Sequence, residues 1–418
     1  MSELDKKGKR RGVIIIAPAW HSCGSYQVFK SQVEAYRSLG CETYFLAIPT
    51  TLHTTSISKH FWKNYLEMTD DLNSSFRGES NLSESLLLRS ATYKQVASAI
   101  SKSPVMWRTF RPTLADIPSS LDHFAETHDL VHIHNNHYFN LPMASRIKQR
   151  YGVPKIISET HDIQSEHMFS SAYRPWALGA NARYEAYLRD EFHYSKLADE
   201  LVHLNVEEFG TFAVALPNNK HHLIYPGLHR PPKAIPARQD VDFLIVASNN
   251  EANYNSLRWF LDNVWNEGLN KRATLRIVGN IDRPLRGMGR NRYRQYKDIF
   301  IGRVGELHPW YSRARTVLAP ITRGHGIAIK TIEALSYGLP MIFSPLATRG
   351  FNKHPAVHKL HGLCSTAAEF KSAIEKRIVE MRAHPGQEII TPEIGVYEEL
   401  FTFEKYCAQI ALLLDTRD

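Results

Sequence analysis

The sequence predicts an α/β protein with two Rossmann-like domains, and three observations support this fold class. One strand–helix–strand pattern opens the chain, and a second lies in its last third. The segment between them contains Pro226, Pro231, Pro232 and Pro236, which is typical of a linker. A chain of 418 residues can also bury the cores of two domains.

The first pattern begins at Gly12–Ala17, an apolar run that indicates a buried strand. Tyr26–Leu39 then places its apolar residues at helical spacing, and Thr43–Ala47 resumes as a strand. The loop between the first strand and the helix lacks the GxGxxG sequence. The pattern therefore disfavours a dinucleotide-dependent oxidoreductase.

Strands and helices continue to alternate along both predicted domains. In the first, we expect a strand over Asp129–His137, a strand at Lys155–Glu159, a helix at Tyr184–Leu197, a strand at Glu200–Leu204, a helix at Glu207–Ala215 and a short strand at His222–Tyr225. In the second, we expect strands at Asp242–Ala247, Leu275–Val278 and Ile299–Ile301, a helix at Asn255–Trp265 and a final helix at Tyr397–Leu414.

The stretch Arg323–Phe351 combines a glycine turn with a helix. Gly324 and Gly326 follow a predicted strand at Thr316–Ala319 and allow the backbone to approach a ligand closely. A helix comes next, and Met341–Ser344 resumes as a strand. Because a helix N-terminus carries unpaired N–H groups and the positive end of the helix dipole, this turn is a predicted anion site, with phosphate as the expected ligand.

Lys330 and Glu333 lie three residues apart on that helix and so occupy neighbouring faces. A lysine there can meet a phosphate while the carboxylate accepts hydrogen bonds from sugar hydroxyls, which suits a nucleotide. The alternative is an ordinary crossover helix with a solvated Lys/Glu pair.

Composition and charge restrict the class of protein. Hydrophobic residues make up 43% and charged residues 22% of the chain, as in soluble globular enzymes. No apolar run approaches the roughly 20 residues that a membrane-spanning helix needs. The four cysteines occur singly, which argues against a disulfide framework or a zinc site and favours a cytoplasmic location.

The chain has 51 basic and 42 acidic residues, a net charge of +9. The basic residues cluster at Lys6–Arg11 and between Arg283 and Lys297. Such clusters favour anionic partners, including a membrane surface, although a solvated tail and a solvated face explain them equally well. Nucleic acid is disfavoured, because no recognition motif accompanies the charge.

Histidines gather at the end of the strand Asp129–His137. Ligands of open α/β sheets bind at the carboxyl ends of strands, so His134 and His137 are candidate site residues, whereas His132 is expected to be structural. A metal site is the weaker interpretation, since no carboxylate or cysteine completes it nearby. Asp240-Val-Asp242 spells DxD, a frequent chance match, so no metal site is predicted there.

The run from Gly326 to Pro340 resembles the donor-site motif of retaining glycosyltransferases of the family 4 type. The resemblance implies the GT-B fold, in which two Rossmann-like domains face a central cleft. It also implies that Glu333 binds the nucleotide ribose and that Lys330 lies by the diphosphate. Where the family often has a glutamate contacting the donor sugar, this chain has His325.

The resemblance implies further site residues. His134, Lys330 and Glu333 are the expected catalytic residues, with His134 against the donor sugar. The expected donor-binding residues are Gly24, Ser25, Arg303, Val304, Arg323, His325, Gly326, Ile327, Ala328, Lys330 and Glu333. Val304 would read the nucleobase, and Arg303 or Arg323 would replace basic residues that many relatives have where this chain has Ser248–Tyr254. The unpatterned segment Leu52–Ile117 would shape an acceptor groove.

We therefore expect retaining transfer of a sugar from a nucleotide-sugar donor to a glycan or lipid-linked acceptor, in cell-envelope or extracellular polysaccharide synthesis, without a cofactor or a required metal. The expected division is an acceptor domain at 1–229, a linker at 230–240, a donor domain at 241–396 and a helix at 397–418 that crosses back to the first domain. A nucleotide-sugar epimerase of GT-B architecture and a non-catalytic nucleotide-sugar-binding protein are the alternatives. A cytoplasmic enzyme with this charge would attach peripherally to the inner face of the cell membrane.

Overall fold

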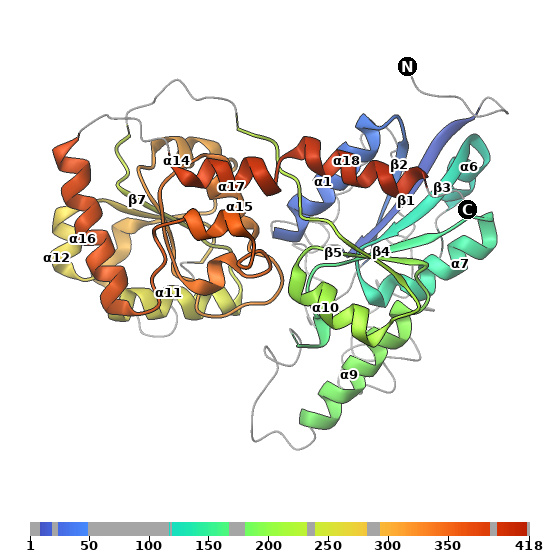
Figure 1. Ribbon diagram of the computed structural model, residues 1–418, viewed down its shortest axis with the longest axis horizontal. Helices are drawn as coiled ribbons and strands as arrows, with labels where there is room; N and C mark the ends of the chain where they lie inside the picture. Colours follow the sequence, from blue (N-terminus) through green and yellow to red (C-terminus); the bar gives the residue numbers. More distant parts are fainter. Residues whose placement is uncertain are drawn as a thin grey trace, which may run out of the picture. The chain divides into compact units, whose positions relative to one another are not determined.

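The computed structural model describes residues 9–18, 24–48, 117, 119–166, 180–231, 239–281, 293–384 and 391–415 (Figure 1). Contacts divide the chain into two compact units. Unit 1 consists of Met1–Tyr225 and Tyr406–Asp418, and unit 2 of Pro226–Lys405. Most of the predicted acceptor groove and of the predicted linker lie outside the described residues. Within the described part of the chain, no helix is long and apolar enough to cross a membrane.

Unit 1 contains a parallel six-stranded sheet in the order β2-β1-β3-β4-β5-β6. The strands are β1 (Arg10–Pro18), β2 (Glu42–Ile48), β3 (His128–Asn135), β4 (Ile156–Thr160), β5 (Glu200–His203) and β6 (Lys220–Leu223). Its helices include α1 (Gly24–Ser38), α6 (Ser119–Thr127), α7 (Leu141–Tyr151), α9 (Ala180–Ser195) and α10 (Val206–Ala215). The strand order reverses between β1 and β3, which is the topological switch point of this sheet.

Both faces of the unit 1 sheet are covered, as a parallel sheet requires. Val13–Ile16 of β1 are fully buried. Ile133 of β3 belongs to a core with α6, α7 and α10, whereas His132 and His134 point to the other face and meet Tyr36 of α1. The alternation of side chains along β3 therefore separates an apolar face from a polar one.

Unit 2 contains a parallel five-stranded sheet in the order β11-β10-β7-β8-β9. The strands are β7 (Phe243–Val246), β8 (Leu275–Val278), β9 (Phe300–Gly302), β10 (Val317–Ala319) and β11 (Met341–Phe343). Its helices include α11 (Glu251–Asn263), α12 (Glu267–Arg272), α14 (His308–Arg313), α15 (Ile329–Ser336), α16 (Ala367–Ala383) and α17 (Pro392–Leu400), with α15 and α17 side by side in Figure 1. This order reverses between β7 and β10.

Gly279 shows how tightly the strand ends of unit 2 pack. Its φ is +127°, and an added Cβ would lie 1.9 Å from the carbonyl oxygen of Ala247, just after β7. No other residue fits there without moving the backbone. This contact holds the carboxyl ends of β7 and β8 together at the edge where ligands of such sheets bind.

The α/β fold class with two Rossmann-like units is confirmed, and several element bounds differ from the prediction. The helix predicted at Asn255–Trp265 begins at Glu251, because the Asn250 side chain accepts a hydrogen bond from the Asn253 backbone and caps it. The short strand predicted at His222–Tyr225 lies two residues earlier, where it pairs with β5.

The prediction of a single final helix at Tyr397–Leu414 is wrong. The structure has α17 and a separate α18 (Phe403–Asp415), broken at Phe401–Thr402. The Leu228 N–H donates to the Phe401 carbonyl, Leu228 and Thr402 form a β-bridge, and the Thr402 hydroxyl accepts from the Lys405 N–H. A distant segment thus takes the backbone groups that would have continued the helix. Within α18, the contact division assigns Tyr406 onward to unit 1.

Candidate functional site

A pocket in unit 2 lies at the topological switch point of its sheet. It is lined by the ends of β7 and β10, by Asn253 and Ser256 of α11, and by Lys330 and Thr331 of α15. Open α/β sheets bind their ligands at this place, because the loops that leave the two central strands diverge there. The pocket is therefore the candidate ligand site of unit 2.

The glycine turn beside this pocket has the backbone that the sequence predicts. Gly324 has φ +144° and Gly326 has φ +64°, both in regions that favour glycine. Arg349 holds the turn in place: its guanidinium donates to the carbonyls of His325 at 2.8 Å and Leu346 at 3.0 Å. An added Cβ on Gly324 would lie 3.1 Å from that guanidinium. Sequence reasoning missed Arg349, because nothing local ties it to the turn.

The first turn of α15 suits an anionic ligand. No side chain caps it, since the residue before it is Ala328. Lys330 is half-buried at the pocket, and the buried Thr331 hydroxyl has no hydrogen-bond partner among the described residues. A buried hydroxyl without a partner is costly, so it indicates a ligand that bonds to it. The helix start, the lysine and the hydroxyl together can hold a phosphate.

Glu333 is half-buried one turn further along α15. The Tyr311 hydroxyl of α14 donates to Glu333 Oε2 at 3.3 Å. Burial raises the pKa of Glu333, while the positive charge of Lys330 and the Tyr311 hydrogen bond act in the opposite direction. Lys330 and Tyr311 therefore both favour the ionised form of this carboxyl group, whereas its burial disfavours it.

The structure brings His325, Gly326, Ile327, Ala328, Lys330 and Glu333 together, because they form one turn and the helix after it. Arg323 is exposed at the start of the turn. Arg303, also exposed, and the half-buried Val304 follow β9 after Gly302, whose φ is +83°. The segment Ser248–Tyr254 lies where many relatives have basic residues. Here Asn250 caps α11, and the Asn253 side-chain amide donates hydrogen bonds to Ser248.

In unit 1, His134 is fully buried at the carboxyl end of β3. Tyr36 Oη lies 2.7 Å from His132 Nε2 and 2.7 Å from His134 Nδ1, and His134 Nε2 lies 3.4 Å from Glu159 Oε2. A tyrosine hydroxyl has one proton, so it donates to one imidazole and accepts from the other. A proton on His134 Nε2 faces the Glu159 carboxylate favourably, which makes Tyr36 the donor to His134. One tautomer of His134 is thereby selected, and its predicted contact with a donor sugar stays a prediction.

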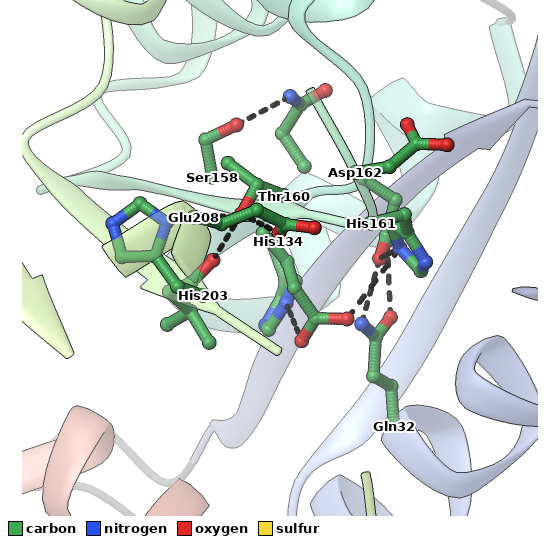
Figure 2. A network of polar contacts seen from close by, with 12 residues as sticks. Gln32, His134, Ser158, Thr160, His161, Asp162, His203 and Glu208 are labelled. Atoms are coloured by element: carbon green, nitrogen blue, oxygen red, sulfur yellow. Dashed lines mark hydrogen bonds and ion pairs between the residues drawn. The ribbon is translucent and has the colours of Figure 1, made fainter. Parts of the chain in front are cut away.

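Figure 2 shows the polar groups around this histidine at the carboxyl ends of β3 and β4. Gln32 and Asn136 form a reciprocal pair of amide hydrogen bonds of 2.6 and 3.0 Å across the switch point. His161 Nε2 lies 3.1 Å from Asn136 Oδ1 and 3.5 Å from Glu159 Oε1. Burial lowers the pKa of His161, which favours the neutral ring, and a proton on Nε2 is then donated to Asn136 Oδ1.

The predicted residues Gly24 and Ser25 form the first turn of α1, and the preceding residues 19–23 lie outside the described part of the chain. His137 Nδ1 accepts a hydrogen bond from the Phe139 N–H and so caps the short helix Tyr138–Asn140. The DxD carboxylates are used structurally: Asp240 binds Arg313 through two hydrogen bonds of 2.7 and 2.6 Å, and Asp242 accepts from the Thr274 N–H.

A second network in Figure 2 contains a buried carboxyl group, Glu208. His221 Nε2 donates to the Leu216 carbonyl, and His221 Nδ1 lies 2.9 Å from His203 Nε2. His203 Nδ1 lies 2.9 Å from Thr160 Oγ1, which lies 2.9 Å from Glu208 Oε2. Burial lowers the pKa of His203 to about 3, so this ring carries a single proton.

Proton counting leaves two arrangements at Glu208, and burial favours one of them. Thr160 Oγ1 has a single proton for its contacts with His203 Nδ1 and Glu208 Oε2. Either Thr160 donates to Glu208, or it donates to His203 and accepts from a protonated Glu208. Burial, reinforced by the negative charge of Asp162, raises the pKa of Glu208 well above its usual range, which favours the protonated carboxyl group.

Glu208→Gln is expected to reduce the loss of unit 1 stability between pH 5 and pH 8. The folded carboxyl holds its proton while the unfolded one loses it above its ordinary pKa, so wild-type stability falls as pH rises through this window. Glutamine is neutral throughout. The Tm of the variant minus that of wild type should be several degrees larger at pH 8 than at pH 5, since ~1 kcal/mol corresponds to about 2–4 °C for a unit of this size. The exposed neighbour Glu207→Gln is the control, and an equal effect in both variants would contradict the assignment.

Comparison with known proteins finds a family match for part of the chain and the same fold in several solved structures. Residues 240–380 match the family described as glycosyl transferases group 1, and this range contains the whole unit 2 pocket. The solved structure of sucrose-phosphate synthase from Thermosynechococcus elongatus is similar over 97% of this chain and 98% of its own, with a TM-score of 0.59 and 15% identity. The chain therefore has the GT-B fold, and its residues 240–380 are similar to glycosyl transferases of group 1.

Two further solved structures share the fold with this chain. HepE from Anabaena, solved in complex with UDP and glucose, has a TM-score of 0.59 at 14% identity over 97% of this chain and 99% of its own. WaaG, a glycosyltransferase involved in lipopolysaccharide biosynthesis, has a TM-score of 0.52 at 12% identity over 97% of this chain and 96% of its own. No curated protein sequence matches the chain.

Proposed function

We propose that this protein is a glycosyltransferase, which moves a sugar from a nucleotide-sugar donor to a glycan or lipid-linked acceptor with retention of configuration. The observation that carries the proposal is the unit 2 pocket, where the start of α15, Lys330 and the unpartnered Thr331 hydroxyl meet at the switch point of the sheet. HepE, which shares the fold, has been solved with UDP and with UDP-glucose, so a uridine donor is the first to test.

In this proposal, unit 2 binds the donor through its phosphates and its ribose. The α15 N-terminus and Lys330 meet the diphosphate, and Glu333 accepts hydrogen bonds from the ribose hydroxyls. As the bond between the sugar and the phosphate breaks, negative charge grows on the leaving diphosphate, and these preorganised groups stabilise it. Lys330 and the helix dipole supply this stabilisation without a required metal ion.

Retention is proposed from the resemblance of the stretch Gly326–Pro340 to family 4 enzymes. It requires that the acceptor attack the face of the sugar from which the diphosphate departs. A lipid-linked or glycan acceptor in cell-envelope or extracellular polysaccharide synthesis is proposed because WaaG, which has the same fold, acts in lipopolysaccharide biosynthesis. Unit 1 would supply the acceptor site.

The test combines binding with transfer. Thermal unfolding is measured with UDP, GDP, ADP and their glucose conjugates, because a ligand bound only by the folded state raises Tm. The stabilising donor is then supplied with a labelled sugar and membrane-extracted lipid-linked glycans. Label in the glycan, with the anomeric configuration kept, supports the proposal. Interconversion of the free nucleotide sugar would instead indicate an epimerase, and binding without either reaction a non-catalytic binding protein.

We also propose that the basic clusters attach the enzyme to an anionic membrane surface. Of these clusters, residues 1–8 and 282–292 lie outside the described residues, and Arg10 is paired with Glu42. Each remaining basic residue near such a surface contributes ~1 kcal/mol. The protein should sediment with anionic vesicles and not with neutral ones, and 0.5 M salt should release it. Binding that is independent of lipid charge and salt would refute this electrostatic mechanism.

A further inference from the structure

Tyr311 lies between the unit 2 pocket and Glu333. It lines the pocket, although it belongs to α14 and is 22 positions away from Glu333 in the sequence. Its side chain is 1% exposed. Within the described residues, its hydroxyl has one hydrogen-bond partner, Glu333 Oε2 at 3.3 Å.

Packing fixes the position of that hydroxyl. The ring of Tyr311 stacks on the ring of Tyr337, with centroids 4.6 Å apart and an angle of 18° between the planes. Tyr337 is in turn held through its own hydroxyl, which lies 3.0 Å from His308 Nδ1. Two aromatic rings and a histidine thus leave the Tyr311 hydroxyl little freedom to leave Glu333.

We propose that Tyr311 is a positioning residue for donor binding, whose hydroxyl orients the Glu333 carboxylate and keeps it ionised. The inference rests on the proposed function, because it assumes that Glu333 accepts hydrogen bonds from the donor ribose. A carboxylate can accept several hydrogen bonds at once. With Oε2 bonded to Tyr311, the other lone pairs remain directed at the ligand in one orientation.

The charged groups around Glu333 determine the pH dependence that this role implies. Lys330 lies on the same helix, Tyr311 and His308 lie on α14, and Tyr337 follows α15. Burial raises the pKa of Glu333, and the Tyr311 hydrogen bond lowers it. Loss of the hydroxyl therefore raises this pKa further, so that a smaller fraction of Glu333 is ionised as pH falls.

The test compares Tyr311→Phe with Tyr293→Phe, which removes a hydroxyl that donates to another carboxylate of unit 2, Asp262 Oδ1 at 2.8 Å, outside the pocket lining. UDP affinity is measured by titration calorimetry at pH 6 and pH 8. Tyr311→Phe should weaken UDP binding about 3-fold at pH 8 and about 10-fold at pH 6, in the range of the net contribution of one hydrogen bond. Tyr293→Phe should bind UDP within 2-fold of wild type at both pH values, on the order of experimental error.

A double-mutant cycle separates positioning from a general structural effect. If Tyr311 acts through Glu333, Tyr311→Phe changes UDP affinity little in a Glu333→Gln background. The proposal would be overturned if Tyr311→Phe bound UDP as tightly as wild type does. It would also be overturned if Tyr311→Phe lowered UDP affinity equally in the wild-type and the Glu333→Gln backgrounds. The same cycle in Tm, measured without nucleotide, decides independently whether the two side chains are coupled. The two side chains could prove coupled in Tm while wild type binds no nucleoside diphosphate. That result would overturn the proposed function and leave only the structural contact between Tyr311 and Glu333.

Discussion

Lys330→Ala is expected to lower kcat about 10²- to 10³-fold, the effect of removing one group that stabilises developing charge. Lys330 lies at the pocket in the first turn of α15, where the leaving diphosphate would gain negative charge. Because this charge is larger in the transition state than in the bound donor, kcat should fall more than KM rises. Initial rates over a range of donor concentrations give both constants.

The control for this variant is Lys376→Ala, an exposed lysine on α16 of the same unit. It removes a positive charge from unit 2 outside the pocket lining and should keep the wild-type kcat.

A second consequence is specific to Lys330. Its charge opposes the raised pKa of Glu333, so the acid side of the pH profile should shift to higher pH in Lys330→Ala. Wild-type turnover in Lys330→Ala would remove the lysine from the mechanism.

Glu333→Ala is expected to weaken donor binding and leave the fold intact. A buried sugar hydroxyl that loses its acceptor costs roughly 1–3 kcal/mol, which is about 5- to 150-fold in affinity. Folding should not suffer, because burial raises the pKa of this carboxyl and the folded state therefore gains little from its charge. Calorimetric titration with UDP measures the affinity, and circular dichroism with Tm verifies the fold.

Glu398→Ala provides the matched control for the loss of a carboxylate. Glu398 forms an exposed ion pair with Arg230 at 3.0 Å in the same unit. Pairs of this kind contribute ~0.2–1 kcal/mol, so stability should change slightly and donor affinity should not. A folded Glu333→Ala protein with undiminished nucleotide affinity would show that Glu333 does not bind the ribose.

The sequence predicted most of the fold, because strands and helices are encoded by neighbours a few residues apart. The apolar run at Gly12–Ala17 became the buried β1, and the helix after the glycine turn became α15. The prediction failed at the C-terminus, where helical periodicity runs through Thr402. The break there depends on the backbone of Leu228, which no local pattern reveals.

Some features of the candidate site were likewise predicted from the sequence, whereas others depend on the tertiary structure. The sequence alone determined that Gly324, Gly326, Lys330 and Glu333 share one turn and one helix, since residues so close along the chain have little choice of relative position. Only the tertiary structure decided that Tyr311 meets the Glu333 carboxylate.

Two further features were likewise decided by the tertiary structure. Arg349 holds the glycine turn from another segment, and the buried Glu208 contacts Thr160, which also contacts His203. These are hydrogen bonds between elements distant in the sequence. Their formation depends on how strands and helices pack and on which groups lose water, and local periodicity carries no information about either.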